Sequence, residues 1–135
     1  MEKCLNFFGV AAGLIGGVFA WIYGDWDALM AALLSLMAID YITGVVKAAV
    51  EKSVSSETGL KGIGKKVLVL GVVGAACIAG RVAGEALPVR ETVLSFFAAN
   101  EAISIMENVA AAGVPLPQKL KDLLLQLRSG GDGES

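Results

Sequence analysis

The chain has 135 residues, of which 56% are hydrophobic and 18% are charged, and its net charge is −2 with no histidine. Soluble domains contain fewer apolar and more charged residues, and a chain without a dense basic cluster is not expected to bind nucleic acid. With no histidine and no nucleophile beside a base, we expect no catalytic, cofactor or metal site. The composition instead predicts an all-α integral membrane protein.

The first apolar segment, residues 5–23, matches the roughly 20 residues that a helix needs to cross a hydrocarbon core of about 30 Å. A cleaved signal peptide with Lys3 as its charged end is the alternative. The run is too long for that, and it ends in Trp21 and Tyr23, which are typical of an interfacial aromatic belt and not of a cleavage site. We therefore expect a retained transmembrane helix.

Small residues repeat at every fourth position of this segment, at Gly9, Gly13 and Gly17. Such rows let the backbones of two helices approach closely, which favours association inside a membrane. The row therefore predicts a packing surface, either within one chain or between chains. The alternative is that it only reflects the high glycine content of transmembrane helices.

The second apolar segment, residues 28–50, carries a single polar stripe in which Asp40, Thr43 and Lys47 stand at helical spacing i, i+3 and i+7. Charges inside a membrane are costly and are functional by default. One interpretation is the lining of a pore or an assembly seam. The other is structural, with Asp40 paired inside the bundle and Lys47 reaching the membrane surface.

The polar stretch over residues 51–64, rich in serine and glycine, is predicted to be a loop. The Lys65-Lys66 pair that follows is expected to lie at the inner leaflet. The glycine spacing does not fit a phosphate-binding loop.

The third apolar segment, residues 67–87, contains Arg81 and Glu85 at a spacing that lets the two charges neutralise each other. It also contains Cys77, whereas Cys4 precedes the first segment. A lipid-buried thiol is not expected to meet one near the membrane surface, so both cysteines are predicted to be free.

The fourth apolar segment, residues 93–112, is the most polar of the set. Glu101, Ser104 and Asn108 fall on one helix face, and Glu107 adds a second carboxylate. Such a helix can pack its stripe against other helices, line water, or lie in the interface plane. We expect it to cross the membrane, which gives a transmembrane region over residues 1–112.

Residues 113–128 are predicted to form a short amphipathic helix on the cytoplasmic membrane surface, after a break at Gly113 to Pro117. Residues 129–135 are predicted to be a disordered tail.

The distribution of lysine and arginine predicts the orientation. Nine of the eleven basic residues lie in alternate gaps if all four segments cross, and the loop over residues 24–27 has none. Both termini are then cytoplasmic. With three crossings, Lys119, Lys121 and Arg128 would lie outside, against the positive-inside rule.

Three blocks resemble the phage-lysis and toxin-secretion holins: Asp40-Tyr41-Ile42-Thr43-Gly44, the loop that leads into Gly59 to Lys66, and Asn100 to Asn108 followed by Gly113 to Pro117. The similarity covers roughly residues 5–125, and the blocks occur in order. It implies a small phage or prophage protein that oligomerises in the bacterial inner membrane. It also implies lesions that release or activate an endolysin, while relatives beside toxin genes are associated with toxin export.

The resemblance carries over two sets of positions, which are Asp40, Thr43 and Gly44 in one block and Glu101, Ser104, Glu107 and Asn108 in the other. It supplies no catalytic residue. The expected partners are the lipid bilayer, further copies of the chain and, without direct contact being required, an endolysin. A small transporter or ion channel is the main alternative, and a membrane scaffold that recruits a partner through its cytoplasmic loop is another.

Overall fold

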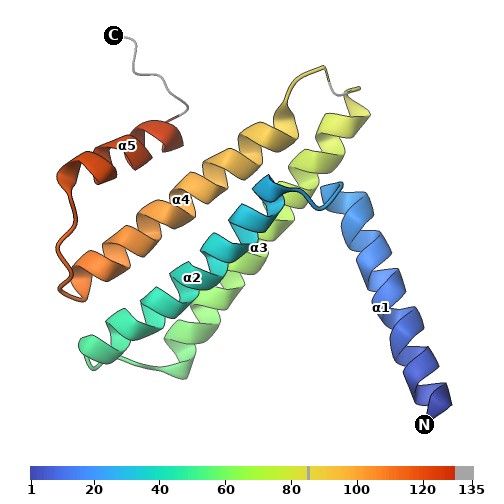
Figure 1. Ribbon diagram of the computed structural model, residues 1–135, viewed down its shortest axis with the longest axis horizontal. Helices are drawn as coiled ribbons and strands as arrows, with labels where there is room; N and C mark the ends of the chain where they lie inside the picture. Colours follow the sequence, from blue (N-terminus) through green and yellow to red (C-terminus); the bar gives the residue numbers. More distant parts are fainter. Residues whose placement is uncertain (85, 130–135) are drawn as a thin grey trace.

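The computed structural model describes residues 1–84 and 86–129, and every regular element within them is an α-helix (Figure 1). This confirms the predicted all-α class. The helices are α1 (Glu2–Tyr23), α2 (Ala28–Val50), α3 (Ser56–Val82), α4 (Val89–Ala111) and α5 (Gln118–Arg128).

The helices α2, α3 and α4 lie side by side and alternate in direction, so they form a three-helix bundle (Figure 1). The helix α1 diverges from this bundle and packs mainly on α3, while Arg90 of α4 donates a hydrogen bond to its last residue, Tyr23. The helix α5 packs on α4. We call the end of the bundle with residues 24–27 the α1–α2 end, and the end with residues 51–55 the α2–α3 end. Because α4 is antiparallel to α3, it runs from the α1–α2 end to the α2–α3 end.

Local capping sets where the bundle helices begin and end. Asp27 precedes α2, and its Oδ1 accepts a hydrogen bond from the Met30 amide at 2.9 Å. Ser55 precedes α3, and its Oγ accepts one from the Thr58 amide at 3.1 Å. These contacts satisfy amide groups that have no partner inside the first turn of a helix. Beyond α4, Gly113 adopts φ 100, a left-handed conformation that favours glycine and ends the helix.

The predicted loop over residues 51–64 is wrong in its second half, because α3 already begins at Ser56. Two of the three glycines that suggested a loop, Gly59 and Gly62, lie on the helix face that packs against Tyr41 of α2. A Cβ added to Gly59 would lie 3.3 Å from the Tyr41 hydroxyl oxygen, and one added to Gly62 would lie 3.8 Å from the Tyr41 ring. The glycines therefore give room to an aromatic side chain between two helices, while Ser55 supplies the cap that starts the helix.

The remaining predicted bounds differ from the structure by a few residues. The third segment, predicted to end at 87, ends as α3 at Val82, and the fourth begins at Val89 instead of 93. The amphipathic helix predicted over 113–128 begins only at Gln118, because Gly113 to Pro117 remain outside regular structure. Of the predicted tail, residues 130–135 lie outside the described residues, and Ser129 caps α5.

The hydrophobic core lies between α2, α3 and α4 in the half of the bundle next to the α1–α2 end. Met30 and Leu33 of α2, Val73 of α3 and Leu94 of α4 are its most deeply buried side chains. Tyr23, from the last turn of α1, also belongs to this core. Only the C-terminal end of α1 is thus packed into the protein.

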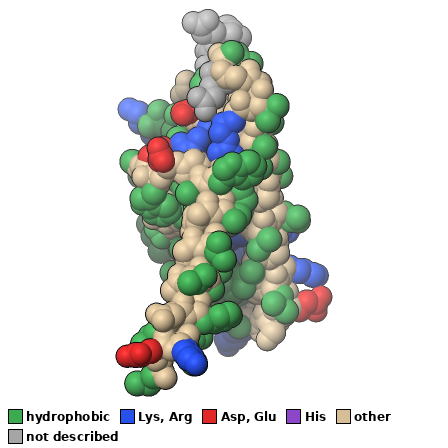
Figure 2. Space-filling view, turned by 90° about the vertical axis from the view of Figure 1, so that its right-hand side faces the viewer, with side chains coloured by type: hydrophobic (Ala, Val, Ile, Leu, Met, Phe, Trp, Pro, Cys, Tyr) green, Lys and Arg blue, Asp and Glu red, His purple; other side chains and the backbone are tan. Residues whose placement is uncertain are grey.

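Hydrophobic side chains also cover much of the outer surface, and charged side chains gather toward the two ends in the view of Figure 2. Along α1, side chains such as Phe7 and Ile15 are each 70% exposed. The helices α1, α2 and α3 are long and apolar enough to cross a membrane. The predicted fourth crossing is not confirmed on this ground, because α4 is too polar to be among them.

The attachment of α1 to α3 depends on a close approach at Gly74. A Cβ on this residue would lie 2.9 Å from Cγ2 of Ile22 and 3.3 Å from the Tyr23 hydroxyl oxygen. The Tyr23 hydroxyl also donates a hydrogen bond of 2.7 Å to the backbone carbonyl of Leu70. A side chain at Gly74 would separate the two helices at this point.

We expect Gly74→Val to lower the free energy of unfolding by about 1–3 kcal/mol, the usual cost of overpacking. The matched control is Gly71→Val on the same helix, since a Cβ at Gly71 meets nothing within 4 Å. Denaturant titration of the full chain in detergent micelles measures both variants. Equal stabilities would show that the α1–α3 contact does not depend on the absence of a side chain at Gly74.

Candidate functional site

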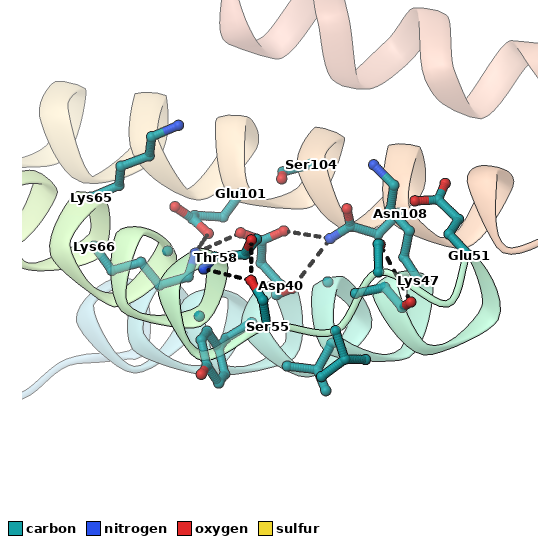
Figure 3. Close-up of a pocket in the computed structure, with 18 of the residues that line it drawn as sticks. Asp40, Lys47, Glu51, Ser55, Thr58, Lys65, Lys66, Glu101, Ser104 and Asn108 are labelled. Atoms are coloured by element: carbon teal, nitrogen blue, oxygen red, sulfur yellow. Dashed lines mark hydrogen bonds and ion pairs between the residues drawn. The ribbon is translucent and has the colours of Figure 1, made fainter.

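Three charged side chains from three different helices meet near the middle of the bundle (Figure 3). The ammonium group of Lys66 on α3 lies 2.5 Å from Oδ2 of Asp40 on α2 and 2.7 Å from Oε2 of Glu101 on α4. Both contacts join an ammonium group to a carboxylate, and such charge-assisted hydrogen bonds are stronger than neutral ones. A single cation therefore links α2, α3 and α4, and we call these residues the Lys66 cluster.

The Lys66 cluster is shielded from the surroundings. The exposed fractions of the side chains are 18% for Lys66, 13% for Asp40 and 6% for Glu101. Removing charges from water is expensive unless they are paired and hydrogen-bonded. Within the described residues, no buried side-chain nitrogen or oxygen lacks a hydrogen-bond partner. The cluster thus meets the condition under which charges persist inside a protein.

Asn108 extends the cluster along α4. Its side-chain amide donates to Oδ1 of Asp40 at 2.9 Å and lies 3.1 Å from the Thr43 hydroxyl oxygen. The Thr43 hydroxyl in turn donates to the Asp40 backbone carbonyl at 3.0 Å. A Cβ on Gly44 would lie 3.6 Å from the Asn108 amide nitrogen, which is an ordinary contact distance. The backbones of α2 and α4 are therefore close at this point.

A groove of about 510 Å³ opens beside the cluster and extends toward the α2–α3 end. It is lined by Asp40, Lys66, Glu101 and Asn108 and by further polar residues from α2, α3, α4 and the α2–α3 connection (Figure 3). These further residues include Lys47, Glu51, Ser55, Thr58, Lys65 and Ser104. The groove gives the otherwise buried cluster a polar path to the end of the bundle.

The structure brings together most of the residues that the sequence singled out as pore or assembly candidates. Asp40, Thr43, Gly44 and Asn108 lie together, and Glu101 is joined to Asp40 through the ammonium group of Lys66. Lys47 and Ser104 line the groove without a direct hydrogen bond to the cluster among the described contacts. Glu107 is exposed and lies outside both the cluster and the groove lining.

The glycine row of α1 is not used inside the chain. A Cβ on Gly9, Gly13 or Gly17 would meet no described atom within 4 Å. Of the two predicted settings for this row, packing within one chain has no contact to support it. Packing between chains stays a prediction.

Sequence reasoning missed the central role of Lys66, which was expected at the inner leaflet together with Lys65. Lys65 is exposed, but Lys66 turns into the bundle. The error came from the predicted loop, because a helix that starts at Ser56 places Lys66 well inside α3. The signal that could have found it is the pair of costly carboxylates on α2 and α4, which require a cation nearby.

A second polar cluster closes the α1–α2 end. The Arg90 guanidinium donates from Nε to the Tyr23 carbonyl at 2.7 Å and from Nη1 to Asp27 Oδ2 at 2.7 Å. Arg81 donates to the Ile22 carbonyl at 3.1 Å. Both arginines thus satisfy carbonyl groups near the end of α1, where a helix lacks internal donors. Glu85, the predicted partner of Arg81, lies outside the described residues.

The hydrogen bond from Arg90 and the cap to the Met30 amide lower the pKa of Asp27 to about 2. A carboxylate with a lowered pKa contributes stability above its unfolded value of about 4 and loses it as the pH falls toward the folded value. The link between Arg90 and Asp27 is therefore charged at neutral pH. Since Asp27 is exposed, this contribution is screened by solvent.

Neither cluster has the composition of a metal or redox site. No group of three or more His, Cys, Asp and Glu side chains is placed to hold a metal ion in residues 1–84 and 86–129. Cys4 is exposed, Cys77 is buried in the core, and both are free thiols. The arrangement offers charge pairing inside a bundle of apolar helices.

Comparison with known proteins agrees with this arrangement. The model of the bacteriophage holin family matches residues 17–129, which include the Lys66 cluster and its groove. The chain belongs to the bacteriophage holin family. Its apolar helices α1, α2 and α3 and this family place it in a membrane, as the composition predicted.

Several bacterial and phage proteins are similar to this chain over most of its length. An uncharacterized 14.9 kDa protein of Clostridium perfringens is 40% identical over 130 residues, covering 96% of this chain and 98% of the relative. An uncharacterized protein of Listeria monocytogenes is 35% identical, covering 99% and 95%. A probable holin of Bacillus phage phi105 is 36% identical, covering 84% and 83%. No solved structure matches the chain.

We expect Lys66→Met to lower the free energy of unfolding by about 3–5 kcal/mol, because it leaves two buried carboxylates without their cation. Lys65→Met is the matched control. Lys65 is the exposed neighbour of Lys66, so its replacement is expected to change the free energy of unfolding by less than about 0.5 kcal/mol. Denaturant titration in micelles compares the two. A Lys66 variant as stable as the control would mean that the ion pairs do not hold the helices together.

Proposed function

We propose that the protein is a holin that oligomerises in the bacterial cytoplasmic membrane and forms lesions there. The lesions release or activate an endolysin and so cause lysis of the host cell, or they export a toxin. The observation that carries this proposal is the match of the holin family model to residues 17–129. The named relative from phage phi105, a probable holin, supports the same assignment.

Assembly of several copies is supported by the unpartnered surface of α1. Its large apolar side chains are exposed from Leu5 to Val18, and Gly9, Gly13 and Gly17 leave a smooth face among them. Close approach through such a face favours helix association in a membrane. In the proposal, α1 of one chain packs against a neighbouring chain.

Four crossings, with both termini in the cytoplasm, form part of the proposal. The helix α4 runs the full length of α2, from the Arg90 contacts at one end to the Asn108 contacts at the other. Its most costly residue for a membrane, Glu101, faces the bundle and pairs with Lys66 instead of facing lipid. The basic residues Lys47, Lys52, Lys61 and Lys65, which lie in or near the α2–α3 connection, support a cytoplasmic α2–α3 end.

A small transporter or ion channel is a second candidate, and the polar groove is the observation that favours it. Ionisable residues inside a membrane-spanning bundle often mark a path for ions or solutes. The groove opens beside the Lys66 cluster toward the α2–α3 end. Unlike a holin, such a protein would move a defined solute without lysing the cell.

The decisive experiment is induction of the gene in a bacterium, with and without a co-expressed endolysin. A holin is expected to arrest growth and collapse the membrane potential after a delay, and to cause lysis when the endolysin is present. Culture density and a potential-sensitive dye follow both events, while chemical cross-linking of the membranes reveals multimers.

The endolysin expressed alone is the control, and it is expected to leave the culture density unchanged. Saturable uptake or efflux of one solute without collapse of the potential would instead favour the transporter. Intact cells in the presence of both proteins, at normal membrane abundance, would contradict the holin proposal.

Single cysteines in a Cys-free background test the topology. Cysteines that replace Asp27 and Val89 are expected to react with an impermeant maleimide from outside the cell, whereas one that replaces Ser55 is expected to react only after lysis. A cysteine that replaces Ser129 reports on α4. Its labelling from outside would leave three crossings and overturn the proposed orientation of the C-terminus.

A further inference from the structure

The charges of the Lys66 cluster do not balance. Two carboxylates, Asp40 and Glu101, share the single ammonium group of Lys66 at 2.5 and 2.7 Å. Asn108 also donates to Asp40, but its amide is neutral and adds no charge. With both carboxylates ionised, the cluster would carry one uncompensated negative charge in the interior of a membrane protein.

In the part of the chain that the structure describes, no second cation pairs with these carboxylates. Lys47 and Lys65 line the same groove, yet neither lies within ion-pair distance of the two carboxylates. The other titratable groups that line it, Glu51 and Tyr41, cannot supply positive charge. The helix α5 packs on α4 without contributing to the described lining, and α1 contributes no residue to that lining either.

The two carboxylates differ in how their negative charge is stabilised. Asp40 accepts hydrogen bonds from both Lys66 and Asn108. Glu101 accepts its described hydrogen bond from Lys66 alone, and its side chain is only 6% exposed. An ionised carboxylate with few donors and little water is costly. Glu101 is therefore the member of the pair that gains more from being neutral.

We propose that Asp40 and Glu101 form a binding site for one exchangeable proton, held mainly on Glu101. The proton makes the cluster neutral, with one carboxylate and one ammonium paired beside a carboxylic acid. It enters and leaves through the groove, which connects the cluster with the α2–α3 end. Proton binding is thus coupled to the contact that joins α4 to α2 and α3.

Infrared spectroscopy of the full chain in liposomes tests this site, because the C=O stretch of a carboxylic acid is separate from the bands of carboxylates and of the peptide backbone. At neutral pH we expect one carboxylic acid band, which shifts in heavy water and disappears on raising the pH. No lysis is involved, so the result is independent of the holin proposal.

The nearly isosteric variants Asp40→Asn and Glu101→Gln each leave one carboxylate for one ammonium, so each is expected to lose the band. Glu107→Gln is the matched control, since Glu107 lies on the same helix but is exposed, and it is expected to keep the band. Circular dichroism confirms that each variant is helical, and two independent variants guard against one that fails to fold.

Three outcomes would overturn the proposal. The first is the absence of the band in the unaltered protein, which would mean that a bound cation balances the charge or that water stabilises the second carboxylate in its ionised form. The second is a band that persists in both Asp40→Asn and Glu101→Gln. The third is loss of the band in Glu107→Gln, which would assign the proton to an exposed residue.

Discussion

The packing of α2, α3 and α4 depends on the ion pairs that the ammonium group of Lys66 makes. These ion pairs lie in the half of the bundle away from the hydrophobic core. In a membrane, the hydrophobic effect does not drive helices together, because lipid tails are as apolar as the helix surfaces. Close packing and polar contacts must do so. Lys66 reaches Asp40 and Glu101 at once, and Asn108 ties α4 to α2 beside it.

Close approach of the helices makes these polar contacts possible. Gly59 and Gly62 leave space on α3 for the ring of Tyr41, and Gly44 leaves space on α2 for Asn108. A Cβ at Gly59 would be tight against the Tyr41 hydroxyl at 3.3 Å, whereas Gly44 and Gly62 have room for a Cβ at ordinary contact distance. The glycines permit the close approach of the helices, and the charged residues stabilise it.

The sequence predicts the helices and much of the site because both follow from periodicity. Apolar runs of about 20 residues mark membrane helices, and the i, i+3, i+7 spacing of Asp40, Thr43 and Lys47 places them on one face. Glycine-rich polar stretches are ambiguous, however, since glycine either breaks a helix or admits a neighbour. The beginning of α3 was missed for that reason, and Lys66 with it.

Contacts between distant segments were not predictable in the same way. Nothing in the spacing along the chain indicates that Arg90 meets the carbonyl of Tyr23 and the carboxylate of Asp27, because these residues belong to separate helices. Local patterns report which residues share a face, whereas the pairing of faces depends on how the bundle folds. The contact of Glu101 on α4 with Lys66 on α3 is of the same kind, because the two residues belong to separate helices.

The helix α1 is joined to the bundle at one end alone. Tyr23, Arg81 and Arg90 hold its last turn, and the rest of the helix extends away from the other helices (Figure 1). The helix α1 is thus fixed at its C-terminal end, at the α1–α2 end of the bundle, and free at its N-terminal end. A small rotation about the fixed end produces the largest displacement at Glu2, more than twenty residues away, and leaves the Lys66 cluster undisturbed. In the proposed assembly, a neighbouring molecule would contact the free part of α1 while the three-helix bundle keeps its own contacts.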